Sequence, residues 1–430
     1  MTVTRVVEAS RGQRLLAIME HYRGEDSPLN TPVIYRLRGD LDRDALAASL
    51  DALPARHEAL RTSYEMSGRR LVQRVHDAWP LRMERRTASG DPAQLESELR
   101  RSVRERFDLA VPPVRATLWD IARDDAVLLL NVHHLCTDGW SGGVLADDLG
   151  RLYQPGSAPA LLAPVASWQY PDFSEWQRCR WEEGLLAGHQ QFWRERLAGT
   201  GAPGLPGAPP GRTGGGQRPG TETFDLGEPA VAGLAELCRA RRASLFTGAL
   251  AVFAAVVHAQ AGDLDFGLAS MFANRLREEL AGTVGFVANL LVLRFTLPAR
   301  PSFDDVLDAA QDMVFDALAH QEVPYHLVPQ RSGERAAGLE NILFQMMAGP
   351  DYQLSLAGLD VTQLPPPRGA GSRFDLEFAL IPGKSGMRGV VWFDRRRFQA
   401  AWVRKLVSGY KAMALGATAD PGRPVASHLC

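Results

Sequence analysis

The sequence predicts an α/β protein made of two lobes, each a β-sheet with helices packed against it. At 430 residues, the chain exceeds the size at which one hydrophobic core keeps growing, so two domains are the default expectation. Segments with helical spacing and segments typical of strands are mixed in both halves, without a short repeat. Hydrophobic residues make up 45% of the chain and charged residues 23%, as in ordinary folded proteins.

The N-terminal lobe is assigned to residues 1–170. Its predicted elements are a helix over 41–53 capped by Asp40 or Asp42, strands over 114–121 and 126–132, and a helix over 141–153. The second strand is nearly all apolar, so it should lie inside a sheet covered on both faces. It delivers His133 and His134 at its carboxyl end, where a strand, a loop and a helix meet.

The C-terminal lobe is assigned to residues 171–430. It should begin with one long amphipathic helix over 172–197. Residues 199–220 contain nine Gly and five Pro, a composition that buries little apolar surface, so we expect a flexible connection. The further elements are helices over 228–241, 244–260, 303–319 and 399–415, and strands over 221–226, 265–269, 288–296, 341–347, 374–380 and 389–393.

Charge and cysteine usage narrow the class of protein. The formal net charge is -2, which gives no reason to expect nucleic acid or a membrane surface as a partner. The four cysteines are scattered without CxxC spacing, which argues against a disulfide framework or structural zinc and fits a reducing cytoplasm. Residues 1–20 lack the apolar core of a secretory signal, and 245–257 is too short to span a bilayer.

The run from His133 to Gly139 carries the clearest chemistry. An imidazole at a strand end, with the carboxylate of Asp138 about one turn away, is typical of a general base. Gly139 adds no side chain, so a substrate arm could pass close to the backbone. Asp138 is placed to form an ion pair that shapes the loop.

The same run allows other interpretations. Two adjacent histidines could bind a metal, but no third ligand of suitable spacing follows, so we expect no metal site. His133 should serve structure, because it alternates with His134 along the strand. Cys136 could be a nucleophile, although its offset does not bring sulfur to imidazole and a buried cysteine is usually inert. The glycines after residue 198 match a dinucleotide fingerprint only formally, since no strand precedes them.

Several segments carry a resemblance to a known family. The run resembles the HHxxxDG motif of nonribosomal peptide synthetase condensation domains, and Trp140 and Ser141 extend it as that family does. Other segments resemble that family's motifs in order, namely Ser10 to Leu15, Arg56 to Thr62, Tyr170 to Gln177, Gly285 to Asn289 and His320 to Tyr325. Leu290 departs from the usual Thr, and 341–347 matches the last motif only loosely. The similarity therefore covers nearly the whole chain.

The resemblance implies a V-shaped pseudo-dimer of two chloramphenicol-acetyltransferase-like lobes around a central tunnel. It identifies His134 as the catalytic residue, and it makes Asp138 a structural aspartate paired with Arg61 or Arg275. The supporting residues are His133, Gly139, Trp140 and Ser141, and the expected tunnel-lining residues on the acceptor side are Asn289 and Ser372.

The function implied is acyl transfer from a carrier-protein thioester to an amine or an alcohol in antibiotic biosynthesis. The substrates would be carried on 4'-phosphopantetheine, with no cofactor bound to the chain itself. Nothing in the sequence is left over for a carrier or adenylation domain, so we expect a free-standing enzyme that meets a peptidyl or aryl carrier in trans. The acceptor would be a small molecule or a second carrier protein.

Two alternatives remain beside this hypothesis. A CoA-dependent HxxxDG acyltransferase of the plant type shares part of the motif, but its DFGWG segment is absent. A catalytically silent condensation-like module would recruit a partner protein, although such modules usually lose the second histidine, and His134 is intact. Epimerization and heterocyclization relatives fit the motif less well.

Overall fold

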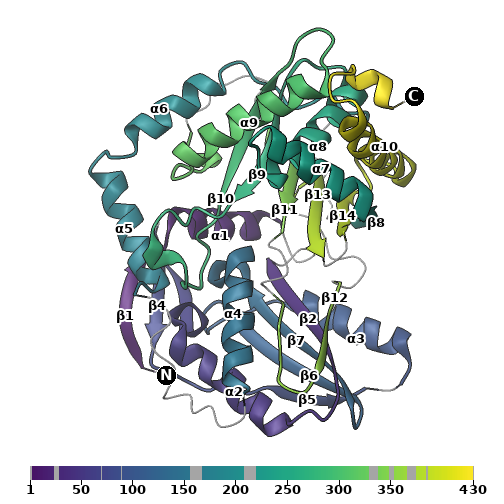
Figure 1. Cartoon of the computed structure of the whole chain (residues 1–430). Helices are drawn as coiled ribbons and strands as arrows, with labels where there is room; N and C mark the ends of the chain where they lie inside the picture. The colour runs from purple at the N-terminus through teal and green to yellow at the C-terminus, as the bar shows by residue number, and fades with distance from the viewer. Residues whose placement is uncertain are drawn as a thin grey trace. The chain divides into compact units, whose positions relative to one another are not determined.

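Helices and strands that mix along the sequence assemble into two units (Figure 1). The computed structural model describes residues 2–23, 29–68, 70–88, 90–154, 167–207, 219–328, 338–347, 353–365, 374–383 and 386–429. Unit 1 comprises Met1–Leu185, Arg275–Ala288 and Asp351–Ala370, and unit 2 comprises Leu186–Asn274, Asn289–Pro350 and Gly371–Cys430. The predicted α/β class with two sheet-and-helix lobes is confirmed.

Unit 1 contains a five-stranded sheet and a smaller three-stranded sheet. The larger sheet has the order β12-β2-β7-β6-β5, and the smaller one β1-β4-β3. The strands are β1 (Val3–Glu8), β2 (Asn30–Arg38), β3 (Thr62–Ser67), β4 (Arg70–His76), β5 (Glu84–Thr87), β6 (Val114–Ala122), β7 (Asp125–His133) and β12 (Asp360–Leu364). The helices are α1 (Arg11–Arg23), α2 (Arg43–Arg56), α3 (Pro92–Arg104), α4 (Gly139–Leu152) and α5 (Tyr170–Glu182), with 3₁₀ turns η1 (Glu58–Arg61) and η2 (His134–Cys136).

Strand β7 is the centre of the larger sheet. It pairs antiparallel with β2 on one side and β6 on the other, and every residue from Ala126 to His133 is buried. Side chains of β7 and β6, including Val127 and Trp119, pack against Leu99 of α3. The predicted strand pair and its burial are confirmed, as is the helix that begins after Asp42, whose carboxylate caps α2.

Unit 2 contains one six-stranded sheet of order β10-β9-β11-β13-β14-β8. Its strands are β8 (Pro219–Gly227), β9 (Asp265–Phe272), β10 (Asn289–Thr296), β11 (Ile342–Met346), β13 (Leu376–Gly383) and β14 (Gly386–Asp394). Its helices are α6 (Ala187–Arg196), α7 (Glu228–Ala240), α8 (Leu245–Ala261), α9 (Phe303–His320) and α10 (Ala400–Ala419). Phe253 of α8 packs on Phe344 and Phe378 of the sheet, and the predicted elements of this part of the chain are confirmed to within a few residues.

The boundary between the units differs from the predicted one. The helix expected over 172–197 is two helices, α5 and α6, because Gly184 adopts a left-handed φ of 72° that ends the first helix. The first unit therefore runs to Leu185 rather than to residue 170. Arg275–Ala288 and Asp351–Ala370 also belong to unit 1. A division at one point of the sequence therefore cannot describe the two units.

The Gly/Pro-rich stretch over 199–220 is partly held by unit 2. The carbonyl of Gly201 accepts a hydrogen bond from Gly267 N of β9 at 2.9 Å, and Gly204 N donates to Asp263 at 2.7 Å. Pro219 already belongs to β8. The predicted flexibility is therefore wrong for the two ends of this stretch, because contacts with unit 2 hold them. Residues 208–218 lie outside the described part of the chain.

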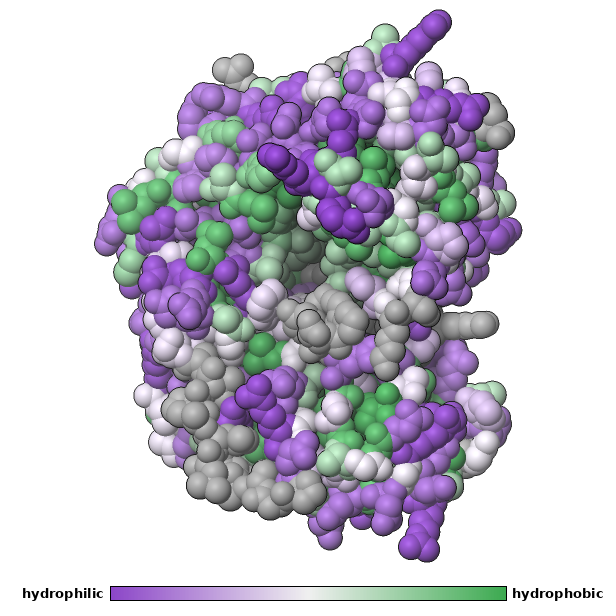
Figure 2. Space-filling model, viewed as in Figure 1, coloured by the Kyte–Doolittle hydropathy of each residue, from purple (hydrophilic) through white to green (hydrophobic). Residues whose placement is uncertain are grey.

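The surface is described by its hydropathy and by the apolar content of the helices. The face shown in Figure 2 is mostly hydrophilic, with hydrophobic side chains in patches between polar ones. Among the described residues no single helix has the length and apolar composition to cross a membrane, and one bent pair, α7 with α8 at 109°, meets those criteria together.

Candidate active site

The candidate site is built in unit 1, where β7 ends. His133 N donates to Pro113 O at 3.0 Å and His134 N donates to Leu29 O at 2.7 Å, so the backbone is held on both sides of the strand end. The chain then turns through η2 and enters α4 at Gly139. This is the predicted strand-loop-helix junction.

The ring of His134 is fixed by the loop that carries it. Nδ1 donates to the carbonyl of Thr137 at 2.7 Å, and the ring meets Phe286 edge to face with 5.0 Å between centroids. Because the neutral ring then has its hydrogen on Nδ1, the basic lone pair is on Nε2. His134 is 9% exposed, so most of the residue is enclosed by protein.

The ring of His133 is turned inward and is fully buried. Its Nε2 lies 3.0 Å from Glu20 Oε2, and its Nδ1 accepts a hydrogen bond from Leu135 N at 3.1 Å. The ring of His133 is therefore hydrogen-bonded inside unit 1, and its supporting role stays a prediction.

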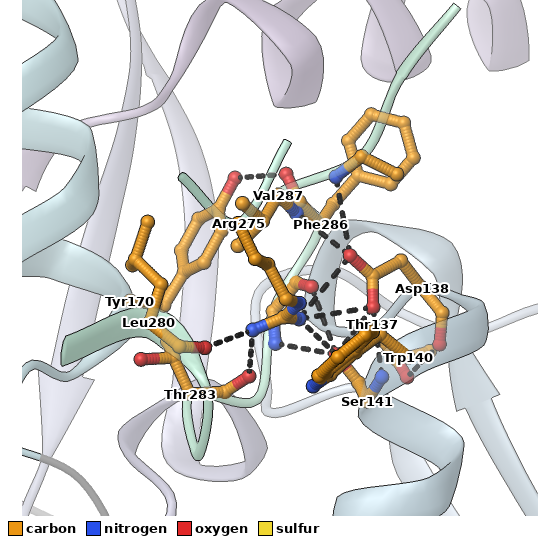
Figure 3. Close-up of polar contacts among 12 residues, drawn as sticks. Thr137, Asp138, Trp140, Ser141, Tyr170, Arg275, Leu280, Thr283, Phe286 and Val287 are labelled. Carbon is orange, nitrogen blue, oxygen red and sulfur yellow. Dashed lines mark hydrogen bonds and ion pairs between the residues drawn. The ribbon is translucent and has the colours of Figure 1, made fainter. Parts of the chain in front are cut away.

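Asp138 ties the loop to a segment that comes about 140 residues later in the sequence (Figure 3). Its Oδ1 caps α4 by accepting from Ser141 N at 2.8 Å, and its Oδ2 accepts from Val287 N and Ala288 N, each at 3.1 Å. Arg275 Nη2 lies 3.2 Å from Oδ1. Arg275 is therefore the predicted arginine partner, and the role of Asp138 is to join two parts of unit 1.

Arg61, the other candidate partner, binds elsewhere. Its Nη1 donates to His76 O at 2.5 Å, and its Nη2 pairs with Glu58 at 3.2 Å. Arg61 ends η1 directly before β3, where the neighbouring strand β4 supplies the acceptor carbonyl. Of the two predicted partners, Arg275 and not Arg61 is therefore the one that pairs with Asp138, because Arg61 binds His76 O and Glu58.

Trp140 and Ser141 support the same arrangement. Trp140 Nε1 donates to Ala281 O at 2.9 Å, and its ring lies 5.5 Å from the Arg275 guanidinium carbon. Ser141 Oγ lies 2.7 Å from Asp138 Oδ1 and accepts from Gly285 N at 3.0 Å. These contacts agree with the supporting roles that the sequence predicted.

Sequence reasoning missed the role of Tyr170 and Phe286. Tyr170 OH donates to the carbonyl of Phe286 at 2.8 Å and contacts Ser10 Oγ at 2.7 Å. Gly285 has a φ of 156°, and a Cβ on it would lie 1.9 Å from the Tyr170 ring. All four residues stand in segments with family motifs, which was the signal available for them.

Three further predicted residues have different outcomes. Gly139 is exposed, and a Cβ built on it would meet no atom within 4 Å, which agrees with room for a substrate arm. Asn289 opens β10 in unit 2 and donates from Nδ2 to Gln321 O at 2.7 Å, so its observed contact is structural and its role in lining stays a prediction. Ser372 lies outside the described residues.

Cys136 does not have the surroundings of a nucleophile. It is fully buried, with Tyr64 OH 3.4 Å from its sulfur, and burial raises the pKa of the thiol to about 12. Since the thiolate is the reactive form, this environment disfavours nucleophilic attack at neutral pH. Within the described ranges, no group of three or more His, Cys, Asp or Glu residues is arranged to hold a metal ion.

Comparison with known proteins gives a consistent match over almost the entire chain. The family model for the condensation domain matches residues 3–429. Chondramide synthase cmdD of Chondromyces crocatus is 29% identical over 97% of this chain, and tyrocidine synthase 2 of Brevibacillus parabrevis is 29% identical over 96%. The chain spans 11% and 12% of the length of these two relatives.

Solved structures show the same fold. The X-domain from teicoplanin biosynthesis is 25% identical, with a TM-score of 0.85 over 99% of this chain and 98% of that chain. The condensation domain from the monacolin K polyketide synthase MokA has a TM-score of 0.85 at 19% identity, over 99% of this chain and all of the other.

Proposed function

From its membership of the condensation-domain family of nonribosomal peptide synthetases, we propose that this chain transfers an acyl group from a carrier-protein thioester to an amine or alcohol acceptor. Condensation domains are acyltransferases that form amide bonds. The observation that carries the proposal is the hydrogen bond from His134 Nδ1 to Thr137 O. It leaves Nε2 as the basic nitrogen of a ring held by its own loop.

The chemistry asked of His134 depends on the acceptor. In either case the acceptor attacks the thioester carbonyl, a C–N or C–O bond forms, and the C–S bond breaks to release the pantetheine thiol. His134 Nε2 takes the proton that the acceptor loses and returns it to the departing sulfur. A free amine is partly neutral near pH 8 and needs alignment most, whereas an alcohol needs its proton removed as it attacks. Kinship with peptide synthetases favours an amine.

The donor would arrive on the 4'-phosphopantetheine arm of a peptidyl or aryl carrier protein. The open space beside Gly139 supports this proposal, since a backbone without a side chain lets a narrow arm approach the loop. We further propose that the protein is a free-standing cytoplasmic enzyme of antibiotic biosynthesis. Its acceptor would be a small molecule or a second carrier protein. Cys136, Cys179 and Cys238 are free thiols, which suits a reducing compartment.

The direct test is reconstitution with a loaded donor carrier. The carrier is charged with an acyl group, and matched amine and alcohol acceptors are added with wild-type protein or His134→Ala. Mass spectrometry of released product and of the unloaded carrier distinguishes amide from ester. Product with wild type alone supports the proposal, and equal product with both proteins would contradict the role of His134. A CoA thioester offered as donor tests the CoA-dependent alternative.

A second candidate function is recruitment of a protein partner. The X-domain from teicoplanin biosynthesis, which is 25% identical to this chain, was solved in complex with OxyB. A recruitment module would bind a partner without turning over a loaded carrier. The intact His134 and its ordered ring favour catalysis, and the reconstitution described above separates the two functions.

A further inference from the structure

Leu135, the residue after His134, is held through its backbone from both sides. Its N–H donates to His133 Nδ1 at 3.1 Å. Its carbonyl accepts from Gln13 Nε2 at 2.9 Å and from Tyr64 OH at 3.1 Å. The Leu135 side chain is fully buried, so this residue is an anchor point for the 3₁₀ turn that carries the ring of His134.

Glu20 determines whether His133 Nδ1 can accept the hydrogen bond from Leu135 N–H. His133 can accept from Leu135 only if its Nδ1 has no hydrogen, which requires the neutral tautomer with hydrogen on Nε2. That hydrogen is buried and needs an acceptor. Glu20 Oε2, 3.0 Å away, supplies it.

One helix reaches both sides of the anchor. Gln13 and Glu20 are seven residues apart on α1, and residues two turns apart lie on the same face of a helix. Gln13 acts on Leu135 directly, whereas Glu20 acts through His133. Contacts from the face of α1 that carries Gln13 and Glu20 therefore help to fix the position of Leu135.

The surroundings keep Glu20 in its charged form. Burial raises the pKa of the Glu20 carboxyl, but the hydrogen bond from His133, the positive charge of Arg106 and the backbone of Leu29 lower it, and the pKa lies below the ordinary value. Arg106 is 4.0 Å from Oε1. The carboxylate is thus available as an acceptor at neutral pH.

We propose that Glu20 is a positioning residue for the condensation reaction, which acts through His133 and Leu135 on the ring of His134. This inference rests on the proposed function. Glu20 stands outside the motifs that the sequence shares with the family, and its position three turns along α1 gives no local hint of a role. A hydrogen-bonded path from Glu20 through His133 to Leu135 connects it to the reaction.

Removal of the acceptor should disturb chemistry more than binding. In Glu20→Leu the buried Nε2–H of His133 loses its partner, so His133 changes tautomer or rotates and releases Leu135 N–H. We expect kcat to fall about 10- to 100-fold with KM little changed, because small misplacements of a catalytic group have effects of that size. Glu20→Gln keeps a side-chain oxygen that accepts the same hydrogen and should retain most of the activity. Glu20→Asp, one methylene shorter, should be intermediate.

The control variant removes an equivalent bond elsewhere in unit 1. Glu98 on α3 accepts a ring N–H from Trp119 Nε1 at 2.8 Å, and neither residue belongs to the loop that carries His134. Glu98→Leu should lower the melting temperature without lowering kcat. If Glu98→Leu lowers kcat as much as Glu20→Leu does, the effect is general destabilisation and the proposal is overturned.

The experiment combines kinetics with NMR of the whole chain labelled with ¹⁵N in histidine. Signals of the two rings are identified by their loss in His133→Gln and His134→Gln. The proposal is supported if Glu20→Leu alters both rings and kcat while Glu20→Gln alters neither. It is overturned if Glu20→Leu, or Glu20→Asp should the leucine variant not fold, has wild-type kcat and unchanged His134 signals. If wild type forms no product, the proposed function is wrong, and the ring signals alone decide whether Glu20 holds His134.

Discussion

Arg275 and Asp138 form an ion pair, 3.2 Å between Nη2 and Oδ1, whose side chains are only 3% and 1% exposed. A buried pair of this kind is strongly destabilising when one partner alone is removed, because the other charge stays in the protein without compensation. The pair joins the loop of the candidate base to a segment far along the sequence. Loss of this ion pair should therefore lower both the free energy of unfolding and the activity.

Asp138→Asn should lower the free energy of unfolding by about 3 to 5 kcal/mol and should reduce turnover. The amide also places N–H groups where the carboxylate accepted from Ser141, Val287 and Ala288. Urea denaturation and the carrier assay measure the two effects. Asp147→Asn is the matched control, since Asp147 pairs with Arg151 in an exposed position on the same helix and such pairs contribute little. An unchanged melting temperature for Asp138→Asn would show that the pair is not structural.

His134→Ala should abolish product formation or lower it by about 10² to 10⁴-fold, the usual contribution of a general base. The fold should persist, because the hydrogen bond that the ring makes to Thr137 O lies within its own loop and the backbone of that loop is also held at Leu135. Circular dichroism and the carrier assay provide the measurement. Turnover at the wild-type rate by a folded variant would remove His134 from the mechanism.

Cys136→Ala should keep most of the activity, since the sulfur is buried beside Tyr64 and the raised pKa of the thiol disfavours the thiolate. The loss of a small buried side chain should cost some stability. Intact-protein mass spectrometry during turnover is the check. An acyl adduct on wild-type protein that disappears in Cys136→Ala together with the activity would favour the nucleophile.

The pH dependence of the rate of His134→Gln should distinguish an amine acceptor from an alcohol acceptor. With an amine acceptor, measurable rate should return at high pH, because more of the amine is neutral and alignment suffices. An alcohol keeps its proton over the accessible range, so no such recovery is expected. A pH series with matched amine and alcohol acceptors makes the comparison, and equal recovery with both would show that this mechanistic division is wrong.

Asp148 should make stability depend on acid pH. Burial raises the pKa of its carboxyl, but hydrogen bonds and charges from His57 and Arg56 outweigh burial and hold the pKa below its ordinary value. The stabilisation is therefore present above the unfolded value near 4 and is lost as pH falls through the folded value. Asp148→Asn should be less stable than wild type at pH 7, with the difference shrinking below about pH 4. A constant difference from pH 7 to pH 3 would contradict this linkage.

The sequence predicted what depends on local pattern and missed what depends on distant contacts. The strands over 114–121 and 126–132 and the helix after Asp42 were predictable because apolar spacing and capping are encoded locally. The choice between Arg61 and Arg275 was not, since both are arginines in plausible segments and only the tertiary fold brings one to Asp138. Gly184 could have indicated the break between α5 and α6, but a glycine inside a helical pattern is often tolerated.

Strand β12 had no counterpart in the prediction. Its residues, Asp360–Leu364, pair with β2, more than 300 positions earlier in the chain. Its side chains are exposed or only partly buried, so neither hydrophobic alternation nor length distinguished it from a loop. An edge strand of this kind is defined by the backbone groups of the sheet it joins.

The discontinuous composition of unit 1 has a consequence for biosynthesis of the protein. A ribosome that has made residues 1–185 has supplied His134 and Asp138, but Arg275 and the amides of Val287 and Ala288 emerge about a hundred residues later, several seconds at usual elongation rates. Strand β12, which pairs with the edge of β2, is translated later still, when residues 360–364 are made. Unit 1 therefore completes its folding only after much of unit 2 has been translated, and a fragment that stops before Arg275 would leave the carboxylate of Asp138 without its cation.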